Sequence, residues 1–505
     1  MSAVPTAQVR GVCFPTHTPH SLLTMKSAPL KVLLVSVVAF ASGCSQPATV
    51  VVPSLPTAQA GTTSQAKSLA IGTAGCLASA CHGASADKSL PQSLSGRIVT
   101  DEKTQWESAG SCWAAADPHG GAHSLLTEHP HRPVHPDKTA AKIMARYNPG
   151  VAATDDARCL ACHTNPALVT PEHMSDPRSR ALHAEGVSCE ACHGNAGGRD
   201  GWIGPHTARD YKGMRSLTDV GDRAMTCLGC HVGAPAGDGY PVRDMNHDMI
   251  AAGHPRLNFD FAEFHRRLPP HWHEKNAGPD FEARLWITGR VAHAEAAAKL
   301  LHSRAERAKV NDARTPWPEF AEFSCGSCHH EIPKPERVKA ALAAGRIPGA
   351  PAWQAVWPAT HDAMSGLPDL KPLVKILEDR LPEGAPARKA RMAHWDQVIG
   401  PANTAARQFG EKRTAMKSMP TDKLLTWAWE PFPKLPKTAP DTLDNDEIGQ
   451  MLLGLAAMER NRLGAPRPDR PAPLKTFTPA FVDILAGKRL DAWSNLNTIL
   501  KDIKR

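Results

Sequence analysis

The chain has 505 residues, which allows two or three domains with a substantial core. Its net charge of +8 is moderate for this length, and no basic run or basic-aromatic platform indicates a nucleic-acid groove, so we expect no nucleic-acid partner. Aromatic residues make up only 5% of the chain, while 45 Pro and 37 Gly indicate a fold rich in loops.

The N-terminal region has the features of a bacterial export signal whose true start is Met25. Two lysines follow that methionine, and residues 32–41 form an apolar stretch too short to span a bilayer. The sequence Ala-Ser-Gly then precedes Cys44, which resembles the lipobox of lipoproteins. We therefore expect a lipid on Cys44, and an ordinary cleaved signal peptide is the alternative.

Either form of the signal exports the chain. We expect a signal peptide over 1–43 and a flexible tether over 44–70, which is rich in Ala, Thr, Ser, Pro and Gln. The expected location is the periplasm or the outer membrane, with membrane contact through the lipid anchor on Cys44.

Five cysteine pairs, each followed directly by a histidine, occupy the next part of the chain. Four have the spacing C-x-x-C-H, and the earliest has four residues between its cysteines. The five are Cys76/Cys81/His82, Cys159/Cys162/His163, Cys189/Cys192/His193, Cys227/Cys230/His231 and Cys325/Cys328/His329.

This motif is typical of c-type haem attachment, in which the two thiols form thioethers and the histidine is the proximal iron ligand. We therefore predict about five covalently bound haems c. Paired cysteines also build structural zinc sites, but zinc does not require a histidine directly after every second cysteine. The wider spacing at Cys76 and Cys81 also permits a small disulfide loop.

The chain has more histidines than the haem irons need as distal ligands. Between residues 71 and 361 there are 17 His beyond the five proximal ones, which makes His/His ligation of the haems the default expectation. The preferred candidates for distal ligands are His119, His206, His247 and His254, and the competing candidates are His183, His135 and His361. A surface or hydrogen-bonding role is the alternative for each one.

The helical pattern becomes regular only late in the chain. We predict one amphipathic helix over 282–309 and a change of composition after His361, where cysteine is absent. Four further helices are predicted near 363–381, 385–411, 443–463 and 478–503. The predicted fold is mostly α with extensive loops, and comprises a pentahaem domain over 71–362 and a C-terminal helical region over 363–505.

The haem region resembles the cytochrome c-554 family, which is more distantly related to hydroxylamine oxidoreductase and octahaem cytochromes. The resemblance lies in GVSCEACHG, in Trp202 followed by His206, and in DPH after Trp113. It implies closely stacked, mainly His/His-ligated haems in a helical scaffold that passes single electrons. It also implies that His119 and His206 are axial ligands.

Three functions follow from these patterns. The first is an electron carrier between a redox donor and a redox acceptor, because closely spaced haems with filled coordination shells move electrons and bind no substrate. The second is an oxidoreductase that acts on a small nitrogen or sulfur compound at one haem with an open coordination position. The third is a zinc-stabilised binding module. We favour the carrier, and no catalytic residue is assigned.

Overall fold

The computed structural model describes residues 69–84, 106–127, 139–310, 316–325, 353–356, 361–378, 387–434 and 445–463, with short gaps inside these ranges and a few single residues outside them. Cys44, the expected signal peptide and almost all of the expected tether lie outside the described residues, as do His135 and Cys328. Thr63–Arg505 group into one compact unit.

The first part of this unit consists of short helices joined by loops and 3-10 turns. The helices are α2 (Ala109–Ala116), α3 (Ala140–Tyr147), α4 (Ala157–His163), α5 (Pro171–Ser175), α6 (Pro177–His183), α7 (Cys189–His193), α8 (Ile203–Thr207), α9 (Val220–His231), α10 (His247–Ala252) and α11 (Phe261–Arg267). Pairing between strands is limited to isolated bridges among the described residues. The prediction of a mostly helical, loop-rich fold is confirmed.

Longer helices follow. They are α12 (Phe281–Lys309), α15 (Lys371–Glu378), α16 (Ala387–Ala415), α17 (Thr421–Trp429) and α18 (Asn445–Leu463). The structure therefore has helices at the four predicted positions that it describes, and it adds α17, which the sequence pattern did not indicate because it is short and lies directly after Pro420. The predicted helix near 478–503 lies almost entirely outside the described residues.

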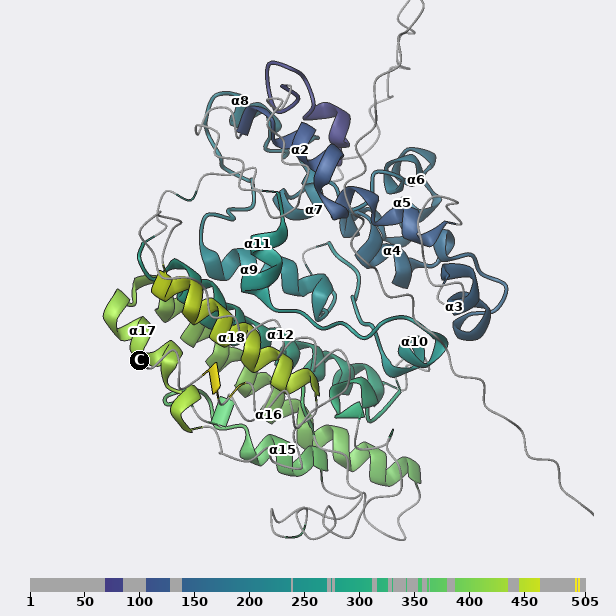
Figure 1. Ribbon diagram of the computed structural model, residues 1–505. Helices are drawn as coiled ribbons and strands as arrows, with labels where there is room; N and C mark the ends of the chain where they lie inside the picture. Colours follow the sequence, from purple (N-terminus) through teal and green to yellow (C-terminus); the bar gives the residue numbers. More distant parts are fainter. Residues whose placement is uncertain are drawn as a thin grey trace, which may run out of the picture. The chain divides into compact units, whose positions relative to one another are not determined.

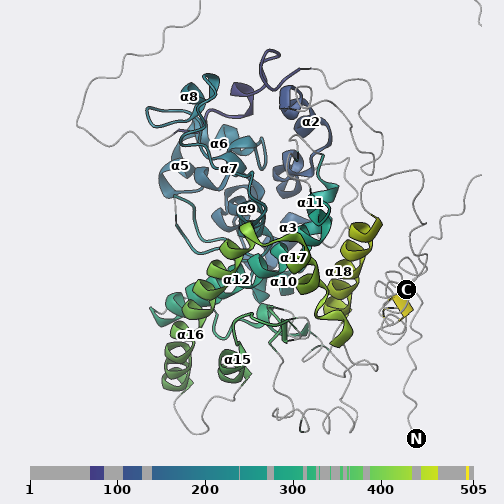
Figure 2. The same cartoon turned by 90° about the vertical axis from the view of Figure 1, so that its left-hand side faces the viewer.

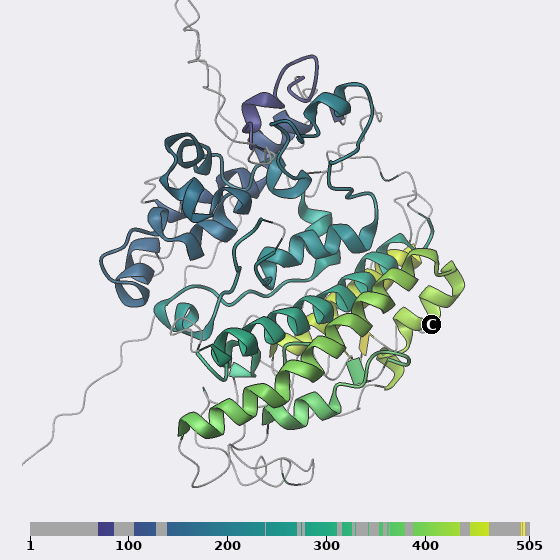
Figure 3. The same ribbon diagram turned by 180° about the vertical axis from the view of Figure 1, so that it is seen from behind.

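The long helices α12 and α16 lie side by side and form the centre of the hydrophobic core (Figures 1 and 3). Helices α9, α11, α17 and α18 also pack on α12, and α15 packs on α16, as Figure 2 shows from another side. Gly454 allows α18 to approach α12 closely, because a Cβ at this position would lie 2.5 Å from the Trp286 ring of α12. No described helix is long and apolar enough to cross a membrane.

Charged groups connect the core helices to the motif-bearing part of the chain. Arg413 of α16 donates to Glu295 of α12 at 2.7 Å and to Asp222 of α9 at 3.0 Å. The Glu295 carboxylate is buried, so the guanidinium supplies the partner that a buried charge needs. These contacts hold α9, which carries the fourth motif, against α12.

Among the residues that the structure describes, the part before α9 has almost no hydrophobic core of its own. The main cluster of buried apolar side chains begins at Ala224 and takes its members from α9 onward. The second cluster has only four buried residues, which are Met144, Ala153, Cys159 and Met249. Something other than apolar side chains must therefore fill the space between the short helices.

Candidate cofactor-binding site

Three of the five motifs occupy the last turn of a helix. Helices α4, α7 and α9 end at His163, His193 and His231, so each motif is wound into one helical turn and its histidine is the last helical residue. Polar caps fix where two of these helices start, because Asp156 accepts from the Arg158 amide and Asp219 from the Asp222 amide. A helical turn brings the two cysteines and the histidine of one motif close together.

The first motif lies against the third. The Glu190 side chain, located between the two cysteines of the third motif, is buried and accepts from the amides of Ile71, Gly72 and Ala196 at 2.7–3.1 Å. The wider loop of the first motif is exposed from Ala78 to Cys81. The glutamate in C-E-A-C-H is a sequence signal for a polar contact at the third motif, but the sequence does not show which amides the glutamate binds.

The fifth motif is described in part. Cys325 and His329 are both exposed, and Arg256 donates to the Cys325 sulfur at 3.2 Å. The preceding segment contacts a predicted distal ligand, since Glu319 accepts from the His247 amide at 2.8 Å and the Phe320 ring lies 5.9 Å from the imidazole of His247. His247 is therefore located next to the fifth motif.

One large cavity runs between the first four motifs. Its volume is about 2520 Å³, and its lining is mainly apolar. Typical pockets for one small molecule hold about 300–1,000 Å³, so this cavity has room for several cofactors. The motif residues that line it are Cys76, His82, Cys159, Cys162, His163, Cys189, Cys192, His193, Cys227, Cys230 and His231. An apolar cavity lined by thiols and imidazoles fits covalently bound haem.

Cysteines of different motifs meet inside this cavity. The thiol of Cys76 interacts with that of Cys189, and the thiol of Cys162 with that of Cys230. The interaction with Cys162 lowers the pKa of Cys230 to about 7, whereas burial raises the pKa of Cys227 to about 12. The first motif is thus next to the third, and the second is next to the fourth.

Three pairs of histidine rings face each other across the cavity. The ring centroids are 5.9 Å apart for His82 and His206, 6.2 Å for His231 and His119, and 6.4 Å for His163 and His254. Metal–imidazole bonds are about 2.0–2.1 Å long, so two imidazoles on opposite sides of one metal ion have centroids roughly 6–6.5 Å apart. Each pair joins a motif histidine to one of the preferred distal candidates, and each separation lies in this range or within about 0.1 Å of it.

The hydrogen bonds of these rings leave the other nitrogen available. The Nδ1 atoms of His82, His163 and His254 bond to backbone carbonyls of Trp106, Ala122 and Pro255 at 2.5, 2.9 and 2.8 Å, and Nδ1 of His119 bonds to the Asp117 carboxylate at 2.9 Å. An Nδ1–H donor of this kind holds the tautomer whose Nε2 lone pair binds metal. The aspartate two residues before His119 was visible in the sequence, but its role was not assigned.

Burial keeps several of these rings neutral. It lowers the pKa of His231 to about 4 and lowers the pKa of His163, while the partner carboxylate raises the pKa of His119 against the effect of burial. A neutral imidazole has the free lone pair that coordination needs.

The other distal candidates lie in different surroundings. Nε2 of His183 bonds to the Leu168 carbonyl at 3.0 Å, and Nε2 of His361 bonds to the Pro368 carbonyl at 2.9 Å. The ring of His361 packs against Phe409 in the helical core. In both residues the nitrogen that would bind iron is already used. His135 lies outside the described residues.

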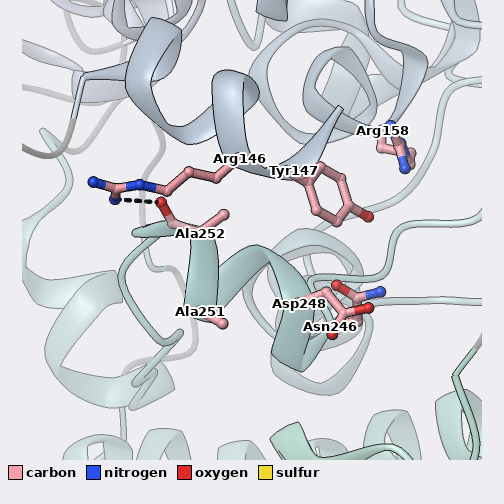
Figure 4. A pocket seen from close by; sticks show the side chains of 7 residues that line it. All are labelled: Arg146, Tyr147, Arg158, Asn246, Asp248, Ala251 and Ala252. Carbon is pink, nitrogen blue, oxygen red and sulfur yellow. Dashed lines mark hydrogen bonds between the residues drawn. The ribbon is translucent and has the colours of Figure 1, made fainter. Parts of the chain in front are cut away.

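A second, smaller hollow lies between α3 and α10 (Figure 4). Its volume is about 490 Å³, and Arg146, Tyr147, Asn246 and Asp248 contribute to its polar lining. Arg146 donates to the Ala252 carbonyl at 3.1 Å, which joins the end of α3 to the end of α10. This polar lining differs from the mainly apolar wall of the motif cavity.

Comparison with known proteins identifies one family. Residues 126–194, which contain the second and third motifs, match the family described as cytochrome c554 and c-prime. No curated protein and no solved structure matches the chain. Within the described parts of the chain, no group of three or more His, Cys, Asp or Glu side chains is arranged to hold a bare metal ion.

Proposed function

We propose that this chain, whose residues 126–194 match the cytochrome c554 and c-prime family, is a haem-binding cytochrome c that passes single electrons between redox proteins through about five covalent haems c. The observation that carries the proposal is the set of three histidine pairs, each at the separation of two axial ligands on one iron. Haem c, when bound, supplies the one-electron couple between ferric and ferrous iron.

The chain's own residues would close the coordination of three of these irons. His206, His119 and His254 face the motif histidines His82, His231 and His163, which supports bis-His ligation of three haems. A closed coordination shell leaves no position for a substrate, so the same geometry favours transfer over catalysis. For the fifth haem we propose His247 as the distal ligand, because its backbone is bound to the segment that leads into the fifth motif.

From the contacts between cysteines of different motifs we propose the order in which the haems pass electrons. Cys76 meets Cys189, Cys162 meets Cys230, and the thiols of Cys192 and Cys227 interact electrostatically. Sulfurs attached to neighbouring haem edges would place those edges close together. The proposed relay therefore runs through the first, third, fourth and second motifs.

Haem counting and electron paramagnetic resonance of the mature protein test the function. We expect five haems per chain by pyridine haemochrome analysis and only low-spin ferric signals at low temperature. A stoichiometric high-spin signal that shifts with nitrite or hydroxylamine would favour the oxidoreductase. An absence of haem, with zinc recovered by metal analysis, would favour the zinc-stabilised module.

We further propose export and a lipid anchor at Cys44, on the sequence alone. Labelling cells with a radioactive fatty acid should mark the wild-type protein and leave the Cys44→Ala variant unmarked. Equal labelling of both, or labelling of neither, would contradict the anchor.

A further inference from the structure

Arg243 occupies a buried position between the second and fourth motifs. Its backbone is held by two hydrogen bonds with Ala234, at 2.8 and 2.9 Å, and its Nε donates to the Gly229 carbonyl at 2.7 Å. Only 8% of the residue is exposed. The guanidinium charge acts on the thiols of Cys162 and Cys230, and the residue lines the same cavity as these cysteines.

A tyrosine and a second arginine hold the guanidinium in place. Arg243 and Arg215 both lie over the Tyr240 ring, with their guanidinium carbons 5.1 and 5.2 Å from its centre, and Arg215 also donates to the Tyr240 hydroxyl. Arg215 in turn donates to the carbonyls of Ala191 and Cys192, at 3.3 and 3.1 Å. Arg215, Tyr240 and Arg243 therefore connect the third motif to the position between the second and fourth motifs.

One end of this buried cation lacks an acceptor. Nη1 of Arg243 is buried and has no hydrogen-bond partner among the residues that the structure describes. The adjacent carboxylate of Asp244 is bound to Arg304 and Arg307 instead. A buried charge without a partner costs several kcal/mol, so the folded protein needs an acceptor at this position.

The cavity indicates which acceptor fits. A guanidinium pairs best with a carboxylate, through parallel N–H donors. Each haem carries two propionate carboxylates, and the neighbouring thiols belong to haem-attachment motifs. We propose that Arg243 binds a haem carboxylate between the second and fourth motifs, and that its buried charge raises the reduction potential of the haems there. This inference rests on the proposed function.

The sign follows from Coulomb's law. Reduction adds one negative charge to a haem, and a fixed positive charge nearby stabilises the reduced form more than the oxidised form. Burial prevents water and salt from screening the interaction. Arg243 therefore makes this part of the relay easier to reduce than its histidine ligands alone would.

Spectroscopic redox titration of the mature protein tests the proposal. Arg243→Gln should favour the oxidised form of one or two of the five haems at least tenfold, which lowers their potentials by 59 mV or more for a one-electron couple. The control is Arg407→Gln, which removes the same charge from an exposed position on α16 and should move no potential. Titration curves of Arg243→Gln that coincide with those of the wild type would overturn the proposal.

A second variant covers the case in which Arg243→Gln fails to retain its haems. Arg243→Lys keeps the charge but not the forked geometry. The redox equilibrium of each haem should therefore stay within tenfold of the wild type, which is a change of less than 59 mV in its potential. A larger shift with the charge intact would overturn the electrostatic role. Loss of haem from both variants would show that Arg243 is structural and would likewise overturn it.

Added acetate distinguishes a haem carboxylate from a free anion. We expect no effect of acetate on the wild-type potentials, because the propionate belongs to the bound haem. A shift that follows acetate concentration and disappears in Arg243→Gln would overturn the assignment to a haem carboxylate. Different results would contradict the proposed function, namely an absence of haem or a high-spin signal in the wild-type protein.

Discussion

At the residue scale, the choice of nitrogen separates the histidines into two classes. His82, His119, His163 and His254 direct Nδ1 to a protein acceptor, which leaves Nε2 for a metal. His183 and His361 use Nε2 for a backbone carbonyl. The sequence alone left His119, His254, His183 and His361 as competing candidates for distal ligands, because residue type and spacing do not show which nitrogen is occupied.

The first prediction concerns the pair of His82 and His206. Replacing His206 by Ala removes one of the two facing rings and should convert one haem equivalent from low spin to high spin. The measurement is electron paramagnetic resonance of the ferric protein at low temperature.

A matched control tests whether the pairing itself is responsible. His361→Ala also removes a buried ring, but one whose Nε2 is bound to Pro368, so its spectrum should remain low-spin. The variant should instead lose about 1–3 kcal/mol of stability, because a buried carbonyl loses its donor. A low-spin spectrum for His206→Ala would contradict the assigned pair.

At the element scale, two kinds of helix perform different tasks. The short helices α4, α7 and α9 present one motif each at their C-terminal ends. The long helices α12, α16 and α18 form the apolar core on which α9 is held. Their periodicity made them predictable, whereas the contacts between them depend on residues far apart in the chain.

The second prediction tests the contact between α12 and α18. In Gly454→Ala the new methyl group would meet the Trp286 ring at 2.5 Å, so we expect a loss of about 1–3 kcal/mol through overpacking. The free energy of unfolding in urea is the quantity to compare.

Gly237, in an exposed loop, supplies the control for this substitution. A Cβ there meets nothing within 4 Å, so Gly237→Ala should leave stability unchanged or raise it by up to about 1 kcal/mol, because alanine restricts the unfolded chain more than glycine does. Equal effects of the two substitutions would show that the Trp286 contact does not limit the packing.

At the scale of the whole molecule, the proposed haems would take the place of a hydrophobic core. The cavity between the first four motifs has a volume of about 2520 Å³ and a mainly apolar lining. Without cofactors this apolar lining would be exposed to water, which disfavours the folded state. We therefore expect the part of the chain that lines the cavity to depend on its haems to fold.

The third prediction follows from that dependence. Protein made without the haem-attachment machinery should be cleaved rapidly by protease between residues 106 and 231. The helices α12, α16 and α18, which belong to the main apolar cluster, should resist longer. Mass spectrometry of the early fragments locates the cuts, and the haem-loaded protein is the reference. Identical digestion of the two forms would contradict the role of haem as core.

The sequence by itself predicted the attachment chemistry, carried the family resemblance and placed the long helices. A motif such as Cys159/Cys162/His163 is local, because residues one to four positions apart share one helical turn wherever the chain goes. The helix predicted over 282–309 was found at Phe281–Lys309, but the prediction that it is amphipathic was wrong, because nearly all of residues 285–301 are buried, on every side of the helix. Local patterns need no knowledge of the rest of the molecule.

Only the tertiary structure decided which histidines face each other and which motifs are neighbours. His163 and His254 are 91 positions apart, and Cys76 and Cys189 are 113 apart. Contacts at such separations are set by how helices pack around the cavity, and many pairings satisfy the same composition. The buried cation Arg243 shows the same limit, because only burial and the missing acceptor distinguish it from any other arginine.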